Sequence, residues 1–211
     1  MENLQKIMQN FKNIIFDFGG VLIDIDFRLT IDAFHQIGFP AFEHMYSQYE
    51  ADQLFRKLEK GEVSDQDFYE VMLKVGKEGL SQEDIRKAWN ALLLDYRRDS
   101  LHHLLLLEKR YQLFLLSNTN KIHYDRFIQY FPGNAEKPTL ESYFSKAYFS
   151  FEMGMRKPDL EIYKFVLSDA GIIPEETLFI DDSYPNIDAA KELGFQTHLL
   201  KPDERIEKIL Q

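Results

Sequence analysis

Short apolar runs, each stopped by small or polar residues, recur along the chain and predict buried strands. The first covers residues 13–18 and stops at Gly19-Gly20, and the second covers 112–116 and stops at Ser117-Asn118. Further strands are predicted at 146–151, 177–180 and 196–200, with helical patterns between strands at 101–110, 158–170 and 185–193. Strands that alternate with helices are typical of crossover units, so we expect an α/β fold: a Rossmann-like parallel sheet with helices on both faces.

One segment breaks this alternation. From about residue 27 to residue 98 no convincing strand is found, whereas Ser64 and Ser81 each precede an acidic residue by three positions, as in helix capping boxes. Apolar residues then recur at helical spacing. We therefore expect residues 25–98 to form a helical cap, most simply a four-helix bundle, inserted into a core made of residues 1–24 and 99–211.

Composition narrows the range of partners. The chain has 211 residues, 45% of them hydrophobic, and 25 Lys and Arg against 35 Asp and Glu give a formal net charge of −10. An acidic surface argues against nucleic acid, and no apolar run approaches the roughly 20 residues of a membrane span. With no cysteine and no secretory signal pattern, a soluble cytoplasmic protein, monomeric or homodimeric, is the expectation.

Polar residues that can carry chemistry follow four of the predicted strands. Asp17 ends the first strand before two glycines, which let backbone N–H groups approach an anion. Ser117 ends the second, and Lys157 stands just before a helix after the third. The fourth ends in Asp181-Asp182, a pair whose repulsion a hard divalent cation relieves. Capping or solvation would explain each alone, but all four lie at the ligand-binding edge of one sheet.

These segments resemble the four motifs of the haloacid dehalogenase-like hydrolase superfamily. The segments FDFGGVLIDIDF, LSNTN, GMRKP and FIDDSYPNIDAAKELG are most similar to bacterial sugar-phosphate phosphatases near alpha-glucose-1-phosphate phosphatase and to the phosphatase half of soluble epoxide hydrolases. The insert lies where that family carries a helical cap. The resemblance implies a Mg²⁺-dependent phosphomonoesterase that acts on a small phosphorylated metabolite, with a sugar phosphate favoured.

The resemblance also implies a role for each residue. Asp17 would be the nucleophile that becomes an aspartyl phosphate. Asp17, Asp182 and the backbone carbonyl of Gly19 would hold Mg²⁺, with Asp181 as an outer partner. Ser117 and Lys157 would hold the phosphoryl oxygens. The backbone N–H groups that follow Gly19 and Asn118, those of Gly20 and Thr119, would add donors.

One position departs from the family pattern. Family phosphatases usually carry a general acid/base Asp two residues after the nucleophile, and here that residue is Gly19. Such a loss can lower the rate roughly 10²–10⁴-fold unless the group is replaced. Asp24, His123, a cap residue or an ordered water could take its place. The alternatives for function are a phosphonate hydrolase or haloacid dehalogenase of the same superfamily, or a catalytically weak phosphate-binding protein.

Overall fold

A five-stranded parallel sheet is the centre of the computed structural model, which describes residues 11–39, 42 and 49–210. The strand order is β5-β4-β1-β6-β7, and every neighbouring pair is parallel. The strands are β1 (Asn13–Phe16), β4 (Gln112–Ser117), β5 (Lys146–Phe149), β6 (Thr177–Asp181) and β7 (Gln196–Leu199). All five strands expected from the apolar runs are confirmed, with β1 and β5 each ending two residues earlier than expected.

Alternating residues of β1 face two separate apolar layers, as the two-residue period of a strand requires. Ile14 and Phe16 pack into one core with α7, α8 and α12, whereas Ile15 packs into a second core with α10 and α11. These helices are α7 (Arg98–Leu107), α8 (Lys121–Gln129), α10 (Leu160–Ala170), α11 (Tyr184–Glu192) and α12 (Ile206–Ile209). The sheet is thus covered on both faces, as expected. None of the described helices combines the length and the apolar character needed to cross a bilayer.

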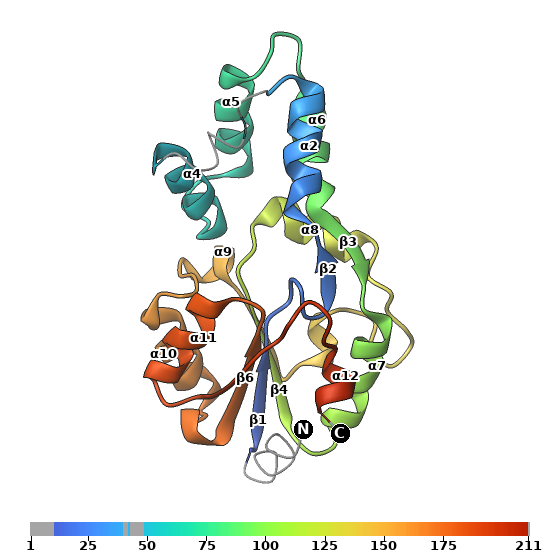
Figure 1. Cartoon of the computed structure of the whole chain (residues 1–211), viewed down its shortest axis with the longest axis vertical. Helices are drawn as coiled ribbons and strands as arrows, with labels where there is room; N and C mark the ends of the chain where they lie inside the picture. Colours follow the sequence, from blue (N-terminus) through green and yellow to red (C-terminus); the bar gives the residue numbers. More distant parts are fainter. Residues whose placement is uncertain (1–10, 40–41, 43–48, 211) are drawn as a thin grey trace.

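The segment expected to be a helical insert does carry helices. Those described are α2 (Phe27–Ile37), α4 (Tyr49–Glu59), α5 (Asp65–Val75) and α6 (Gln82–Trp89), and Figure 1 shows them beyond one end of the sheet. Phe34, Phe55, Phe68 and Trp89 belong to one buried cluster that these helices share. The Ser64 and Ser81 side chains cap α5 and α6 as the sequence predicts. The bundle packing and the domain boundaries remain predictions.

The expectation that residues 27–98 contain no strand is wrong. β3 (Leu93–Tyr96) lies within this segment and pairs antiparallel with β2 (Ile23–Ile25), which follows β1 directly. This two-stranded ribbon lies between the parallel sheet and the helices of the insert (Figure 1). Both strands are short, and their partners are about seventy residues apart in the chain, so no local apolar run announces them.

Candidate active site

Lys157 is the centre of a buried ionic cluster at the carboxyl ends of β1, β4 and β6. Its Nζ donates to Asp17 Oδ1 at 2.6 Å, to Asp181 Oδ2 at 2.7 Å and to the carbonyl oxygen of Leu116 at 2.7 Å. The lysine is only 1% exposed, so it is not a solvated surface residue. A buried ammonium needs acceptors for all three protons, and these three contacts supply them.

Asp17 is held at the end of β1 by the neighbouring strand. Its N–H donates to the carbonyl oxygen of Ile180 at 2.8 Å, and its carboxyl group is buried. Burial raises the pKa of Asp17 to about 7, with Lys157 opposing the shift and the charges of Asp181 and Asp182 adding to it. A second positive charge beside Asp17 would therefore stabilise its ionised form.

Three carboxylates converge beside the lysine. One oxygen from each of Asp17, Asp181 and Asp182 lies within 4.8 Å of the others. Three carboxylates against one ammonium leave an excess of negative charge when all are ionised. An all-oxygen donor set of this kind suits a hard divalent cation such as Mg²⁺. The sequence prediction that these distant acids meet is therefore confirmed.

Asp181 and Asp182 differ in how many hydrogen bonds the carboxylate already accepts. Fully buried Asp181 accepts from Lys157, from the N–H of Ser183 at 2.8 Å, and from Asn186 Nδ2 at 3.0 and 3.1 Å. Asp182 is exposed at the residue level, but desolvation of its carboxyl group and the charge of Asp181 raise its pKa. Asp182 is thus the more available of the two for a ligand.

The glycine pair after Asp17 has two different roles. Gly20 has a φ of +68°, and a Cβ there would lie 2.2 Å from Asp182 Oδ2. Only glycine leaves room for this carboxylate. At Gly19 a Cβ would lie 3.0 Å from Ile25 Cδ1, so an apolar side chain from β2 borders the position where the family has its second Asp.

The end of β4 brings Ser117 to the same place, and the loop that follows it fixes Lys157 there. Ser117 is 2% exposed, and no partner for its hydroxyl is found in the described part of the chain. Asn118 Nδ2 donates to the carbonyl oxygen of Lys157 at 2.8 Å, and the N–H of Lys157 donates to Asn118 Oδ1 at 2.9 Å. The Asn118 side chain therefore ties the two loops together.

Two backbone donors expected to bind phosphate are already bonded. The N–H of Gly20 donates to the carbonyl oxygen of Ile23 at 2.8 Å. The N–H of Thr119 donates to Ser150 Oγ at 2.9 Å. The expectation that these N–H groups are free for an anion is therefore wrong for this conformation. The tight turn after β1 uses the N–H of Gly20, and a contact between the segments that follow β4 and β5 uses the N–H of Thr119.

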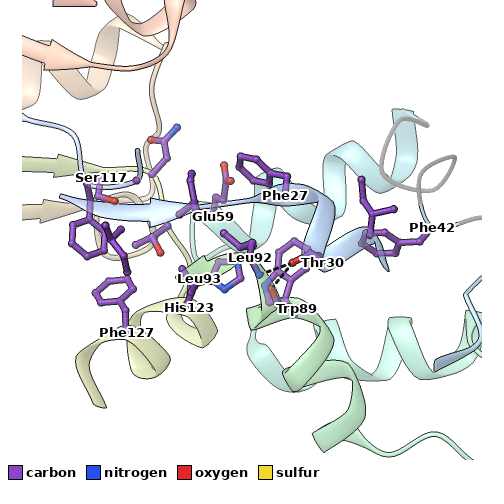
Figure 2. Close-up of a pocket in the computed structure, with 17 residues that line it drawn as sticks. Phe27, Thr30, Phe42, Glu59, Trp89, Leu92, Leu93, Ser117, His123 and Phe127 are labelled. Atoms are coloured by element: carbon purple, nitrogen blue, oxygen red, sulfur yellow. Dashed lines mark hydrogen bonds between the residues drawn. The ribbon is translucent and has the colours of Figure 1, made fainter. Parts of the chain in front are cut away.

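A pocket lined by Gly19 and Ser117, the residues that border the ionic cluster, extends toward the insert. Figure 2 shows Ser117 at one end and Phe42 at the other, with His123 and Trp89 between them. Most of its lining is apolar or aromatic. Sequence analysis missed Glu59, which lines the pocket from α4 and accepts from Arg156 Nε at 2.8 Å.

The two named acid/base candidates lie in different places. Ile23 and Ile25 of β2 line the pocket, whereas Asp24 between them does not, and its carboxylate accepts from Arg97 Nε at 2.7 Å. The structure therefore does not bring Asp24 into the pocket. His123 does line it, and burial lowers the pKa of His123 to about 3. A histidine of this kind is neutral at pH 7 and cannot serve there as a proton donor in its charged form.

Comparison with known proteins agrees with this geometry. The family model for haloacid dehalogenase-like hydrolases matches residues 11–194. The chain belongs to this family. It is 36% identical over 191 residues to the D-ribitol-5-phosphate phosphatase of Bacteroides thetaiotaomicron, and the match covers 88% of this chain and 90% of that protein.

Solved structures of the haloacid dehalogenase-like family share the fold along nearly the whole chain. A family enzyme from Bacteroides thetaiotaomicron, solved with magnesium and inorganic phosphate, is 39% identical with a TM-score of 0.88, covering 95% of this chain and 100% of that one. A HAD-like family hydrolase from Porphyromonas gingivalis is 34% identical with a TM-score of 0.84, and the match covers 93% of this chain and 94% of that one.

Proposed function

We propose that this hydrolase is a Mg²⁺-dependent phosphomonoesterase that acts on a small phosphorylated metabolite, with a sugar or polyol phosphate favoured. The observation that carries the proposal is the convergence of Asp17, Asp182 and Lys157 at the end of β4, where the hydroxyl of Ser117 has no partner among the described residues. The relatives support it, since one is a D-ribitol-5-phosphate phosphatase and another was solved with magnesium and phosphate.

In this proposal the Asp17 carboxylate attacks phosphorus and displaces the alcohol, and water then hydrolyses the aspartyl phosphate. Asp17, Asp182 and the backbone carbonyl of Gly19 would hold Mg²⁺, which supplies positive charge against the phosphate dianion. Lys157 balances the charge of Asp17 and Asp181, to which it is bonded. Ser117 would bind a phosphoryl oxygen, and Lys157 would join it by exchanging one of its three present acceptors for another phosphoryl oxygen. Asp181 keeps Lys157 in place.

Proton transfer to the leaving alcohol needs a different source from the usual one. Ile25 borders the site of the missing carboxyl group, Asp24 is paired with Arg97, and His123 stays neutral. A water ordered in the pocket is the donor that these observations favour. We therefore expect a turnover rate lower than that of family members with the second Asp.

A panel of phosphate esters tests the proposal. The protein should release phosphate from ribitol 5-phosphate and hexose phosphates with Mg²⁺, and lose this activity with a chelator. The competing reactions have their own readouts. Metal-independent chloride release from a 2-haloacid, cleavage of a phosphonate, or tight phosphate binding without turnover would each replace the proposal.

A further inference from the structure

His123 is a buried pocket residue fixed with respect to the loop that follows β4. It lies in the first turn of α8, where its N–H donates to the Oδ1 of the capping residue Asn120 at 3.0 Å. Its ring stacks on that of Trp89, with centroids 4.9 Å apart and planes 15° from parallel. The cap holds the backbone at this position and the stack holds the ring, so the imidazole has little freedom to turn away from the pocket.

The hydrogen bonds around His123 decide which ring nitrogen carries the proton. His123 Nδ1 lies 2.9 Å from Asn90 Oδ1. The other end of this amide is fixed, because Asn90 Nδ2 donates to the carbonyl oxygen of Arg86 at 3.0 Å. An amide oxygen can only accept, so we assign the proton to Nδ1. Nε2 then carries a lone pair and is an acceptor.

This acceptor is left without a partner among the residues that the structure describes. No hydrogen bond to His123 Nε2 is found within the described ranges, although the residue is only 8% exposed and lines the pocket. The Thr30 hydroxyl of the same wall, by contrast, is occupied: it accepts from the N–H of Leu92 and donates to the carbonyl oxygen of Trp89. Nε2 itself is not fully buried, so it stays accessible from the pocket, where a ligand hydroxyl can donate to it.

We propose that His123 is a specificity-determining residue whose Nε2 accepts a hydrogen bond from a hydroxyl of the leaving group, so that the site selects polyhydroxylated phosphate esters over alkyl phosphates. This assignment rests on the proposed function for the phosphate end of the ligand. Burial keeps His123 neutral at physiological pH, so the acceptor is retained there. The apolar wall, including Phe18 and Phe127, suits the C–H faces of a carbohydrate chain.

Binding to a variant that cannot turn over tests the assignment directly. In an Asp17→Asn background with Mg²⁺, calorimetry compares ribitol 5-phosphate with pentyl phosphate, which has the same chain length without the hydroxyls. Adding His123→Phe should weaken ribitol 5-phosphate binding by about tenfold, and pentyl phosphate binding by less than about threefold. His123→Gln, which keeps an amide acceptor, should recover part of the selectivity. Thermal unfolding of each variant establishes that it folds.

Three results would overturn the assignment: equal losses for the two ligands, no loss for either, or no binding of ribitol 5-phosphate to the Asp17→Asn protein. Turnover by protein with Asp17 intact is recorded separately. If hydroxyl selectivity in binding depends on His123 but phosphate is never released, the proposed function fails while the assignment of His123 stands.

Discussion

Lys157 shows how a single residue organises the candidate site. Its ammonium group is buried, yet each of its protons has an acceptor, and two of these acceptors come from carboxylates at the ends of different strands. Removing such a group leaves buried carboxylates without a counter-charge, which is more costly than losing a surface ion pair. The position of Lys157 in the site is therefore explained by charge balance with Asp17 and Asp181 as well as by its proposed contact with phosphate.

Gly20 provides a test of how Asp182 is positioned. A Cβ at Gly20 would overlap Asp182 Oδ2, so Gly20→Ala should displace this carboxylate and weaken Mg²⁺ binding by about 10–100-fold. Calorimetric titration with Mg²⁺ measures the change.

Gly171→Ala is the matched control for this experiment. Gly171 has a φ of +65°, close to the +68° of Gly20, but nothing lies within 4 Å of a Cβ built there. Both variants carry the backbone strain, about 1 kcal/mol, and only one carries the clash. Equal Mg²⁺ affinity in the two variants would show that Asp182 does not bind the ion.

The lowered pKa of buried His123 should make the free energy of unfolding depend on pH. Its pKa is lowered from 6.5 to about 3 by burial, so between these values the unfolded chain binds a proton that the folded protein excludes. The free energy of unfolding should therefore fall by about 1 kcal/mol per pH unit as pH drops below 6.5. Urea unfolding at pH 7 and pH 5 should show this loss in the wild type and a smaller one in His123→Gln.

Comparison of wild type and variant at each pH isolates this contribution. The raised pKa of Asp17 acts in the opposite direction, since the folded state then holds a proton that the unfolded state releases, and this effect cancels in the difference. His102→Gln, at an exposed position of α7, is the matched control for replacing a histidine by glutamine. An identical pH dependence in His123→Gln would contradict a neutral His123 in the folded protein.

At the residue level, the sequence was sufficient to predict site residues that directly end or follow a strand of the sheet. Asp17, Ser117, Lys157 and Asp182 each end or follow a strand of one parallel sheet, so topology alone brings them together. Sequence could not place Ile25 beside Gly19, or Glu59 in the pocket, because these contacts depend on how the insert packs. It also missed that the expected backbone donors are already used, that of Gly20 by a local turn and that of Thr119 by the side chain of Ser150.

At the scale of elements, the parallel strands were predictable and the β2–β3 ribbon was not. A central strand buried on both faces leaves an uninterrupted apolar run, as in β1 and β6. β2 and β3 are only three and four residues long and carry acidic residues, so their pairing is set by tertiary structure. This ribbon is nevertheless the element that places Ile23 and Ile25 in the pocket wall.

The contact between α4 and the loop before Lys157 predicts a role for an ion pair. Arg156 Nε donates to Glu59 Oε2 at 2.8 Å, with side chains 19% and 28% exposed. Arg156→Gln should loosen the insert over the pocket and raise KM several-fold, while the free energy of unfolding falls by no more than about 1 kcal/mol. Steady-state kinetics and urea unfolding provide the two measurements.

Arg86→Gln is a suitable comparison for Arg156→Gln. Arg86 pairs with Glu83 at 2.7 Å within α6, so its loss removes an ion pair of similar geometry without touching the α4 contact. A rise in KM of the same size in both variants would mean that the Arg156–Glu59 pair has no special part in substrate binding.

For the whole molecule, metal binding should appear as folding stability. An ion that binds only the folded protein stabilises it by about 2.7 kcal/mol at 100 times its Kd. Mg²⁺ should therefore raise the Tm of the wild type, and Asp182→Asn should largely abolish the increase. The control is Asp188→Asn, at an exposed position of α11. A Tm that Mg²⁺ raises equally in the Asp182→Asn protein would place the ion elsewhere.

The most direct test of the account is to locate the covalent phosphate during turnover. Acid quenching of a reaction with a hydrolysed phosphate ester and Mg²⁺, followed by peptide mass spectrometry, should find phosphate on Asp17 in the wild type. The Asp17→Asn protein should carry no covalent phosphate and release none into solution. Phosphate on another residue, or undiminished turnover by Asp17→Asn, would contradict the assignment of Asp17 as the nucleophile.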